Sequence, residues 1–402
     1  MQHAGWRAAP APQSILVVLP TWVGDFVMAT PTLRAIRNRF TKAGITFLME
    51  PNLRDLVRGG DWMDECIEWP PVGTRSASDG PTPIVDCVGR AARPRTWLQL
   101  VKVLRLPRFD LAVLLPNSFR AALIARLSGA QRRIGYDRDG RGLLLTDRIP
   151  VKNRRGRCDE SQFRSTVRMG SKLPVRLGRY VPMPLVEYYA DLTEAVGCER
   201  PGDRLELFTT PDCEESVQRR LESLGIADRH PLIVISPGAK FGASKCWLPE
   251  RFAAVADHLI ESEGATVIVT CGPGEESIAR AIGAAMTQHG FLFDSPLLTL
   301  GELKSLVRRS DLLIGNDAGP RHIAKAFDVP VVAVFGPTHP DWTSTRYRDE
   351  RLVRIDVDCG PCQQRVCPLG HQQCMTGVSV DMVFTAALAL LHLRTPEHAR
   401  AR

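Results

Sequence analysis

The sequence lacks several patterns that mark common classes of protein. No apolar run approaches the ~20 residues needed to cross a bilayer, so we expect no membrane-spanning segment. No G-x-G-x-x-G follows the first apolar strand, which argues against a dinucleotide oxidoreductase. The loop 236–247 lacks the G-K-[ST] order of a Walker loop. No aromatic platform or recognition helix supports a nucleic-acid-binding protein, so that class stays a less favoured alternative.

Cysteine is not lacking, but only four of the 11 cysteines cluster. The four are Cys359, Cys362, Cys367 and Cys374. Their density predicts a structural zinc site. The spacing is irregular for a zinc ribbon, so a disulfide-bearing loop or oxygen-sensitive free thiols are alternatives. The scattered other thiols, and a start without an apolar leader core, indicate a reducing, cytoplasmic location.

Charge is divided unevenly along the chain. Residues 1–180 contain 30 Lys and Arg against 15 Asp and Glu, a balance of +15, whereas residues 181–402 have a balance of −7, giving +8 in all. A basic first half suggests an anionic partner such as nucleic acid, an acidic membrane surface or a phosphorylated glycolipid. The alternative is a chain that simply favours arginine on its surface.

Short apolar strands alternate with helical segments twice along the chain, which predicts two doubly wound α/β domains with parallel sheets. The length of 402 residues agrees with roughly two to three domains. We expect an acceptor-binding domain at 1–190, a nucleotide-binding domain at 191–385 that includes the cysteine-rich segment 359–374, and a terminal helix and tail at 386–402. We also expect loops at 70–94 and 151–166, and a linker with one strand at 201–211.

Two strand ends of the second half carry residues suited to a nucleotide. In "SPGAKFGASKCW", Lys240 and Lys245 supply positive charge on a loop of small residues, which is a common way to hold phosphate. In "CGPGEES", Glu275 follows a glycine turn and can accept hydrogen bonds from ribose hydroxyls, with Glu276 as the alternative. The competing interpretations are ordinary surface lysines and a glutamate that complements a helix dipole.

A third strand end, "IGNDAGPRHIAKA", predicts an anion site at a helix N-terminus. Asp317 can cap the helix, and the N–H groups near Ala318 and Gly319 then point at the anion. His322 lies in the first turn and can reach the same anion, or it is a packed helix histidine. Together the three strand ends predict a pocket for a nucleoside diphosphate.

The stretch "LPTWVGDFVMATPTLRAI" places a carboxylate, Asp25, at the turn after the first strand. A carboxylate there would repel a phosphate, so a different role is needed. We interpret Asp25 as a general base that takes a proton from an acceptor hydroxyl. The alternative is an N-cap of the helix that follows.

Three stretches resemble the lipopolysaccharide heptosyltransferases of glycosyltransferase family 9, with a lean toward the heptosyltransferase II branch. They are "ILVVLPTWVGDFVMATPTLRAI", "SPGAKFGASKCW" with "PERFAAVADHL", and "NDAGPRHIAKAFDVPVVAVFGPTHPDWT". The resemblance implies the GT-B architecture, with two Rossmann-like domains facing a central cleft. It implies an inverting transfer of heptose from ADP-heptose to an anionic lipopolysaccharide inner-core acceptor, without a catalytic metal.

The resemblance also implies roles and partners. Asp25 falls on the motif base, Lys245 on the phosphate-binding lysine and Glu275 on the ribose-binding acid. The donor-binding turn takes in Asp317, Ala318, Gly319 and His322. The acceptor would be a glycolipid at the inner face of the membrane, contacted peripherally, and no nucleic acid is expected. Ala318 stands where a serine or threonine is common, and Pro320 where a small apolar residue is common, so another nucleotide sugar is the alternative donor.

Overall fold

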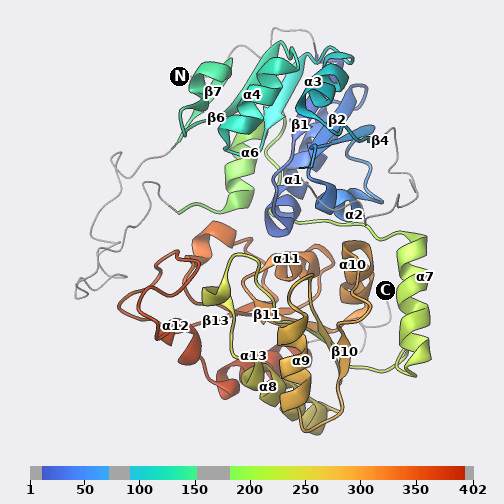
Figure 1. Cartoon of the computed structure of the whole chain (residues 1–402), viewed down its shortest axis with the longest axis vertical. Coiled ribbons are helices and arrows are strands. Elements are labelled where there is room, and N and C mark those ends of the chain that lie inside the picture. Colours follow the sequence, from blue (N-terminus) through green and yellow to red (C-terminus); the bar gives the residue numbers. More distant parts are fainter. Residues whose placement is uncertain (1–10, 72–90, 152–181, 394–402) are drawn as a thin grey trace. The chain divides into compact units, whose positions relative to one another are not determined.

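The computed structural model describes residues 11–71, 91–151 and 182–393, and the chain divides into two compact units. The first unit comprises the described residues up to 151 together with Met183–Phe208, and the second comprises Pro182 and the described residues from Thr209 onward. The boundary expected at residue 190 falls inside a helix, whereas the division by contacts comes after Phe208. Figure 1 shows the first unit in blue to green and the second in yellow-green to red.

The first unit is built on a parallel sheet of seven strands in the order β4-β3-β2-β1-β5-β6-β7. Val17 at the centre of the sheet pairs with Phe47 on one side and Val113 on the other. The parallel sheet that the alternation of strands and helices predicts is confirmed in this unit. The strands are β1 Ser14–Val18, β2 Gly44–Met49, β3 Glu65–Glu68, β4 Ala91–Ala92, β5 Leu111–Leu114, β6 Arg132–Asp137 and β7 Asp147–Pro150.

Helices cover this sheet, and their starts follow local capping chemistry. Ser118 and Thr96 cap α4 and α3 by accepting the N–H groups of Ala121 and Gln99. Helix α1 begins after the N-cap residue Trp22, so the interpretation of Asp25 as an N-cap is wrong. The helices are α1 Val23–Arg39, α2 Arg54–Val57, α3 Trp97–Arg105, α4 Phe119–Leu127 and α6 Leu185–Ala195, with 3₁₀ turns η2 Pro51–Leu53 and η3 Arg141–Leu144.

Three segments expected between the regular elements have different outcomes. The predicted loop 70–94 contains the short strand β4, and its residues 72–90 lie outside the described part of the chain. All but the first residue of the predicted loop 151–166 also lies outside it. The strand predicted within 201–211 is wrong, because these residues form no strand. Instead Glu206 accepts the indole N–H of Trp62 at 2.7 Å and pairs with Arg34 of α1, which fixes this segment to the first unit.

The second unit repeats the design with a parallel sheet of six strands in the order β10-β9-β8-β11-β12-β13. Its central strands are wholly buried, as expected for a sheet covered on both faces. The strands are β8 Leu232–Ser236, β9 Thr266–Thr270, β10 Phe291–Phe293, β11 Leu312–Asn316, β12 Val331–Val334 and β13 Glu350–Val353. The helices are α7 Pro211–Ser223, α8 Pro249–Glu263, α9 Glu276–Ala285, α10 Leu300–Arg309, α11 Gly319–Ala326, α12 Gln373–Thr376 and α13 Val380–His392, with 3₁₀ turns η4 Ala243–Lys245 and η5 Pro340–Thr343.

The strand order of each sheet reverses at one place, and this place is where a binding site is expected. In the first unit the reversal lies between β1 and β5, and in the second between β8 and β11. Ligands of such sheets bind outside the carboxyl ends of the strands at this reversal. The two α/β units confirm the predicted fold class. Within the described ranges, no helix combines the length and apolar character that crossing a bilayer requires.

Candidate donor site and acceptor base

The loops that follow β8 and β11 meet at the reversal of the second sheet. The Lys245 ammonium lies 2.5 Å from Oδ2 of Asp317 and also donates to its backbone oxygen at 3.1 Å. Asn316 joins the same two loops, because its amide donates to the Pro237 oxygen at 2.5 Å and accepts the Trp247 N–H at 3.1 Å. Two of the predicted donor-site residues, Lys245 and Asp317, are therefore in direct contact.

Asp317 does not cap α11, so that prediction is wrong. Ala318 is the N-cap residue, with extended backbone and no side-chain capping bond. The Asp317 carboxylate instead accepts Lys245, the Arg321 guanidinium at 2.7 Å and the Thr338 hydroxyl at 2.8 Å. Charged donors bind a carboxylate more strongly than a neutral backbone N–H does, which explains why the side chain turns toward them.

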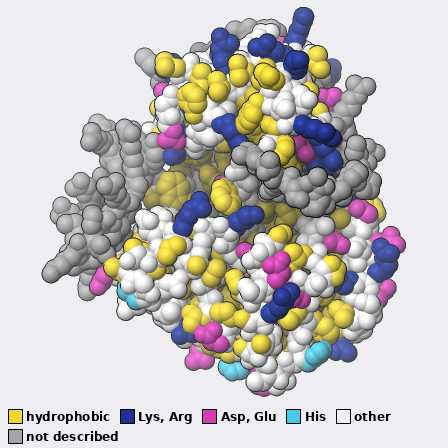
Figure 2. All heavy atoms as spheres, viewed as in Figure 1, with side chains coloured by type: hydrophobic (Ala, Val, Ile, Leu, Met, Phe, Trp, Pro, Cys, Tyr) yellow, Lys and Arg dark blue, Asp and Glu magenta, His cyan; other side chains and the backbone are white. Residues whose placement is uncertain are grey.

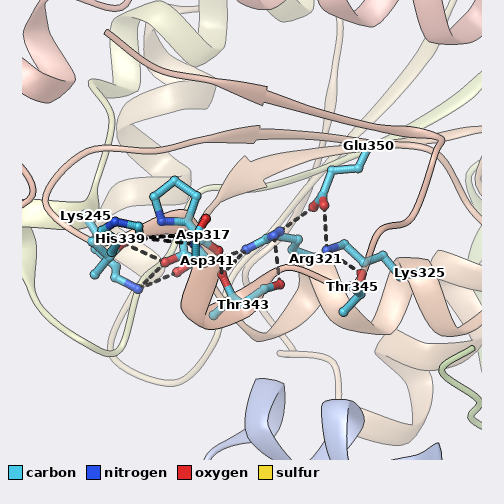
Figure 3. Close-up of polar contacts among 11 residues, drawn as sticks. Lys245, Asp317, Arg321, Lys325, His339, Asp341, Thr343, Thr345 and Glu350 are labelled. Atoms are coloured by element: carbon cyan, nitrogen blue, oxygen red, sulfur yellow. Dashed lines mark hydrogen bonds and ion pairs between the residues drawn. The ribbon is translucent and has the colours of Figure 1, made fainter. Parts of the chain in front are cut away.

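A chain of buried charges continues beneath α11 (Figure 3). Arg321 lies between Asp317 and Glu350, and Lys325 pairs with Glu350 at 2.7 Å. Arg321 and Lys325, one helical turn apart, are 1% and 3% exposed, so burial of these charges is nearly complete. With Lys245, three basic side chains face two carboxylates, so the site favours an additional anion whenever Lys325 is protonated.

The buried charges set the ionisation of their neighbours. Burial alone would raise the pKa of Asp317, but Arg321 and Lys245 hold it below its usual value, so the carboxylate stays ionised. Burial, with help from Arg321, lowers the pKa of Lys325 to about 7 despite the pairing with Glu350. The charge of the network therefore changes near neutral pH.

His322 is fully buried in the first turns of α11. Burial, followed by the charges of Lys325 and Arg321, lowers its pKa well below the ordinary value, so the imidazole is neutral at pH 7. Its Nδ1 has no hydrogen-bond partner among the described residues. Together with the N–H groups at the start of α11 and the Lys245 ammonium, this arrangement can hold a phosphate-like anion.

Glu275 connects this site to the neighbouring strand β9. It is the N-cap residue of α9, and its Oε2 accepts the Gly272 N–H at 3.0 Å. A Cβ at Gly238, after β8, would lie 1.9 Å from that oxygen, so a side chain there would displace the carboxylate from this position. Glu276 is the first residue of α9. Lys240 lies on the exposed part of the β8 loop and takes no part in the buried network.

In the first unit, Asp25 occupies the first turn of α1, at the carboxyl end of β1. Its side chain is partly exposed and lies near Tyr189 of α6. Burial raises the pKa of Tyr189 and the Asp25 charge raises it further, so the phenol stays protonated. A carboxylate in this position can accept a proton from a bound hydroxyl.

Sequence reasoning missed a polar group at the end of β5. The Asn117 oxygen accepts the Tyr188 hydroxyl at 2.9 Å and the Arg141 guanidinium at 3.2 Å. Arg141 is completely buried and also donates to the backbone oxygens of Tyr136 and Pro116. Burial lowers its pKa to about 10. No spacing in the sequence predicts the contacts of Asn117 with Tyr188 and Arg141. The position of Arg141 in the turn after β6 is a weak hint.

The cysteine prediction is corrected by the structure. Within the described residues, no group of three or more His, Cys, Asp or Glu side chains converges to hold a metal ion, so the structural zinc is not supported. Cys359, Cys362, Cys367 and Cys374 are all free of disulfides. Cys374 packs into the hydrophobic core, where burial, followed by the neighbouring thiols of Cys362 and Cys359, raises the pKa of its own thiol to about 11.

Two Rossmann-like units, each with polar side chains at its sheet reversal, are the arrangement found in GT-B glycosyltransferases, and the comparison of sequences assigns the chain to the glycosyl-transferring enzymes. The sequence profile of glycosyltransferase family 9 (heptosyltransferase) matches residues 97–159 and 179–373. The chain belongs to this family.

Individual relatives align over nearly the whole chain. Lipooligosaccharide heptosyltransferase 2 of Haemophilus ducreyi is 26% identical over 382 residues, covering 92% of this chain and 97% of its own. A crystal structure of a family 9 glycosyltransferase from Veillonella parvula has a TM-score of 0.71 at 20% identity, covering 95% and 98%. The structure of E. coli ADP-heptose lipopolysaccharide heptosyltransferase II has a TM-score of 0.68 at 22% identity, covering 94% and 99%. At these identities the structures establish the fold.

Proposed function

We propose that the protein transfers heptose from ADP-heptose to an anionic lipopolysaccharide inner-core acceptor, with inversion and without a catalytic metal. The observation that carries the proposal is the contact of Lys245 with Asp317 at the start of α11, beside the glycine-bounded carboxylate of Glu275. The names of the relatives support it, because the H. ducreyi protein is a lipooligosaccharide heptosyltransferase and the E. coli structure is named for ADP-heptose.

The second unit would bind the donor. Lys245 and the N–H groups of Ala318 and Gly319 would contact the diphosphate, with Lys240 adding charge from the loop. The Glu275 carboxylate would accept the ribose hydroxyls. Neutral His322 would donate or accept one hydrogen bond through its unpartnered ring nitrogen. The negative charge that grows on the leaving diphosphate would be stabilised by the excess of buried cations.

The first unit would bind the acceptor. Its hydroxyl would lose a proton to Asp25 as the oxygen attacks the anomeric carbon of the heptose. The bond from that carbon to the β-phosphate oxygen would break on the opposite face, so ADP departs and the configuration inverts. The anionic acceptor suits a unit whose sequence is strongly basic. We place the enzyme in the cytoplasm, in peripheral contact with the inner membrane.

A nucleotide panel tests the donor assignment. Unfolding temperature would be measured with ADP, UDP, GDP and CMP and with their sugars. A ligand at 100 times its Kd raises the free energy of unfolding by about 2.7 kcal/mol, which is easily detected. We expect stabilisation by ADP and ADP-heptose, followed by heptose transfer to a lipopolysaccharide inner-core acceptor. Stabilisation by UDP, GDP or CMP alone would favour the same mechanism with another nucleotide sugar, and stabilisation by none would refute the donor site.

A further inference from the structure

Helices α3 and α4 of the first unit lie side by side and present apolar side chains to solvent. The Arg105 Nε of α3 donates to the Leu127 oxygen of α4 at 2.9 Å, and at the other end Arg120 of α4 lies 5.8 Å from the Trp97 ring. The inward side chains of both helices enter the core of the unit. The outward side of the pair is referred to below as the α3–α4 face.

Large apolar side chains on the α3–α4 face are unusually exposed. Leu98 and Leu106 are 77% and 79% exposed. On α4, Phe119, Leu123 and Leu127 recur every four residues, so they form one row along the helix, and they are 51%, 39% and 38% exposed. Isolated exposed leucines are ordinary, but a row of them beside two further leucines is a feature of interaction surfaces.

The same face is strongly basic. Residues 93–127 contain seven Lys and Arg and a single acidic residue, Asp110, which is occupied by the N–H groups of Gln13 and Ser14. Five of the cations are exposed and form no ion pair with any carboxylate in the described part of the chain. They are Arg95, Lys102, Arg105, Arg108 and Arg126. Figure 2 shows hydrophobic and Lys or Arg side chains intermingled on the unit at the top of the view.

We propose that the α3–α4 face docks on an anionic lipid bilayer. Exposed leucine and phenylalanine side chains enter the boundary between headgroups and acyl chains, while the surrounding cations contact acidic headgroups. This assignment deepens the membrane contact of the proposed function by giving it a surface, on the unit to which we assign the glycolipid acceptor.

Two other occupants fit the face less well. A second copy of the chain in a two-fold dimer would oppose the five unpaired cations to an identical set, which is unfavourable. A nucleic acid would pair with the arginines through its phosphates, but it would leave Leu98 and Leu106 without an apolar partner. An anionic bilayer provides an apolar environment for the exposed leucines and acidic headgroups for the cations.

Vesicle binding by the full-length protein tests this inference without any sugar substrate. We would measure co-sedimentation with phosphatidylcholine vesicles, with and without about one-third phosphatidylglycerol. The wild type should bind only the anionic vesicles. The variant L98E/L106E should lose at least about tenfold in affinity, because two carboxylates replace the inserting side chains. L224E, which changes a 41% exposed leucine of the second unit, is the matched control and should bind like the wild type.

A second variant keeps the test decisive if L98E/L106E folds poorly. K102Q/R126Q removes two exposed cations and leaves the apolar rows intact, and each loss should weaken binding about fivefold. Equal vesicle binding by all variants, salt-sensitive binding to RNA or DNA in preference to vesicles, or a change from dimer to monomer in L98E/L106E would overturn the inference. The increase in unfolding temperature that nucleotides give should be the same in these variants as in the wild type. Vesicle binding therefore tests the α3–α4 face, and nucleotide stabilisation tests the donor site independently.

Discussion

The two units share one strand order but place different chemistry at its reversal. In the second unit, buried cations and carboxylates are paired, with Lys245 against Asp317 and Arg321 against Glu350. In the first unit, the carboxylate of Asp25 is partly exposed at the corresponding position after the first strand. The second arrangement is suited to holding an anion, and the first to exchanging a proton.

Buried arginines sharpen this difference. Arg321 contacts two carboxylates, whereas the contacts of Arg141 within the described part of the first unit are backbone oxygens and the Asn117 amide. The shared topology therefore decides where polar side chains gather, because parallel strands end at one edge of each sheet. The side chains at that edge decide whether a buried arginine is paired with carboxylates, as Arg321 is, or hydrogen-bonded to uncharged oxygens, as Arg141 is.

The largest expected effect is a loss of turnover in a variant that lacks the proposed base, Asp25, but keeps the proposed donor site. Asp25→Asn keeps the shape of the side chain but removes the proton acceptor, so kcat should fall by about 10²–10⁴-fold. The ADP dissociation constant should stay unchanged, since the residue belongs to the other unit. Single-turnover transfer rates and ADP titrations measure the two quantities on the same preparation.

Lys245→Met tests the other proposed role, which is the binding of the donor diphosphate by the second unit. Loss of a charged hydrogen bond to the diphosphate should weaken ADP about tenfold to a hundredfold. If Asp25→Asn transferred heptose at the wild-type rate, or if both variants lost nucleotide affinity alike, the division of roles between the units would be wrong.

The donor site was partly predictable from the sequence. Lys245, Glu275 and Asp317 each follow a buried apolar strand, and parallel strands bring their carboxyl ends together, so the meeting of Lys245 and Asp317 follows from pattern alone. The predicted cap was wrong because capping rules consider only the local backbone. The rule could not weigh Arg321 and Thr338, which compete for the same carboxylate through the tertiary fold.

The buried charges beneath α11 were not predictable. Arg321 and Lys325 are spaced four residues apart on a short helix, a pattern more often found on a solvated face. Their burial depends on Glu350, which belongs to a strand that sequence reasoning did not identify. The one hint of burial in the sequence is that Arg321 and Lys325 are four residues apart with the apolar residues Ile323 and Ala324 between them. Arg141 likewise depends on oxygens from elements distant in the sequence.

The next largest effect is a loss of stability, which should differ between variants of the two buried arginines. Arg321→Met leaves Asp317 and Glu350 buried without their main counter-charge, so the free energy of unfolding should fall by about 3–5 kcal/mol. Arg141→Met leaves only neutral acceptors unsatisfied and should cost about 1–3 kcal/mol. Urea denaturation of both variants gives the comparison directly, and a greater loss for Arg141→Met would contradict the distinction between charged and neutral networks.

The last prediction has the smallest effect over any one pH unit and concerns the pH dependence of the second unit. Burial lowers the pKa of Lys325 to about 7 from its ordinary 10.5, so between these values the unfolded chain binds a proton that the folded chain lacks. The free energy of unfolding should therefore rise with pH over this window, by up to about 1.4 kcal/mol per pH unit. Below the window both states carry the proton, and the cost of burying the charge is complete.

Lys325→Met should abolish this contribution, because no group remains to titrate. The difference in unfolding free energy between wild type and variant would be measured at several pH values across the window, and it should move in favour of the wild type as pH rises. Lys102→Met, at an exposed position of α3, provides the control and should follow the wild type. A Lys325→Met curve parallel to the wild type would mean that Glu350 keeps the ammonium charged in the folded protein. The network would then hold a fixed excess of positive charge at every pH at which a diphosphate binds.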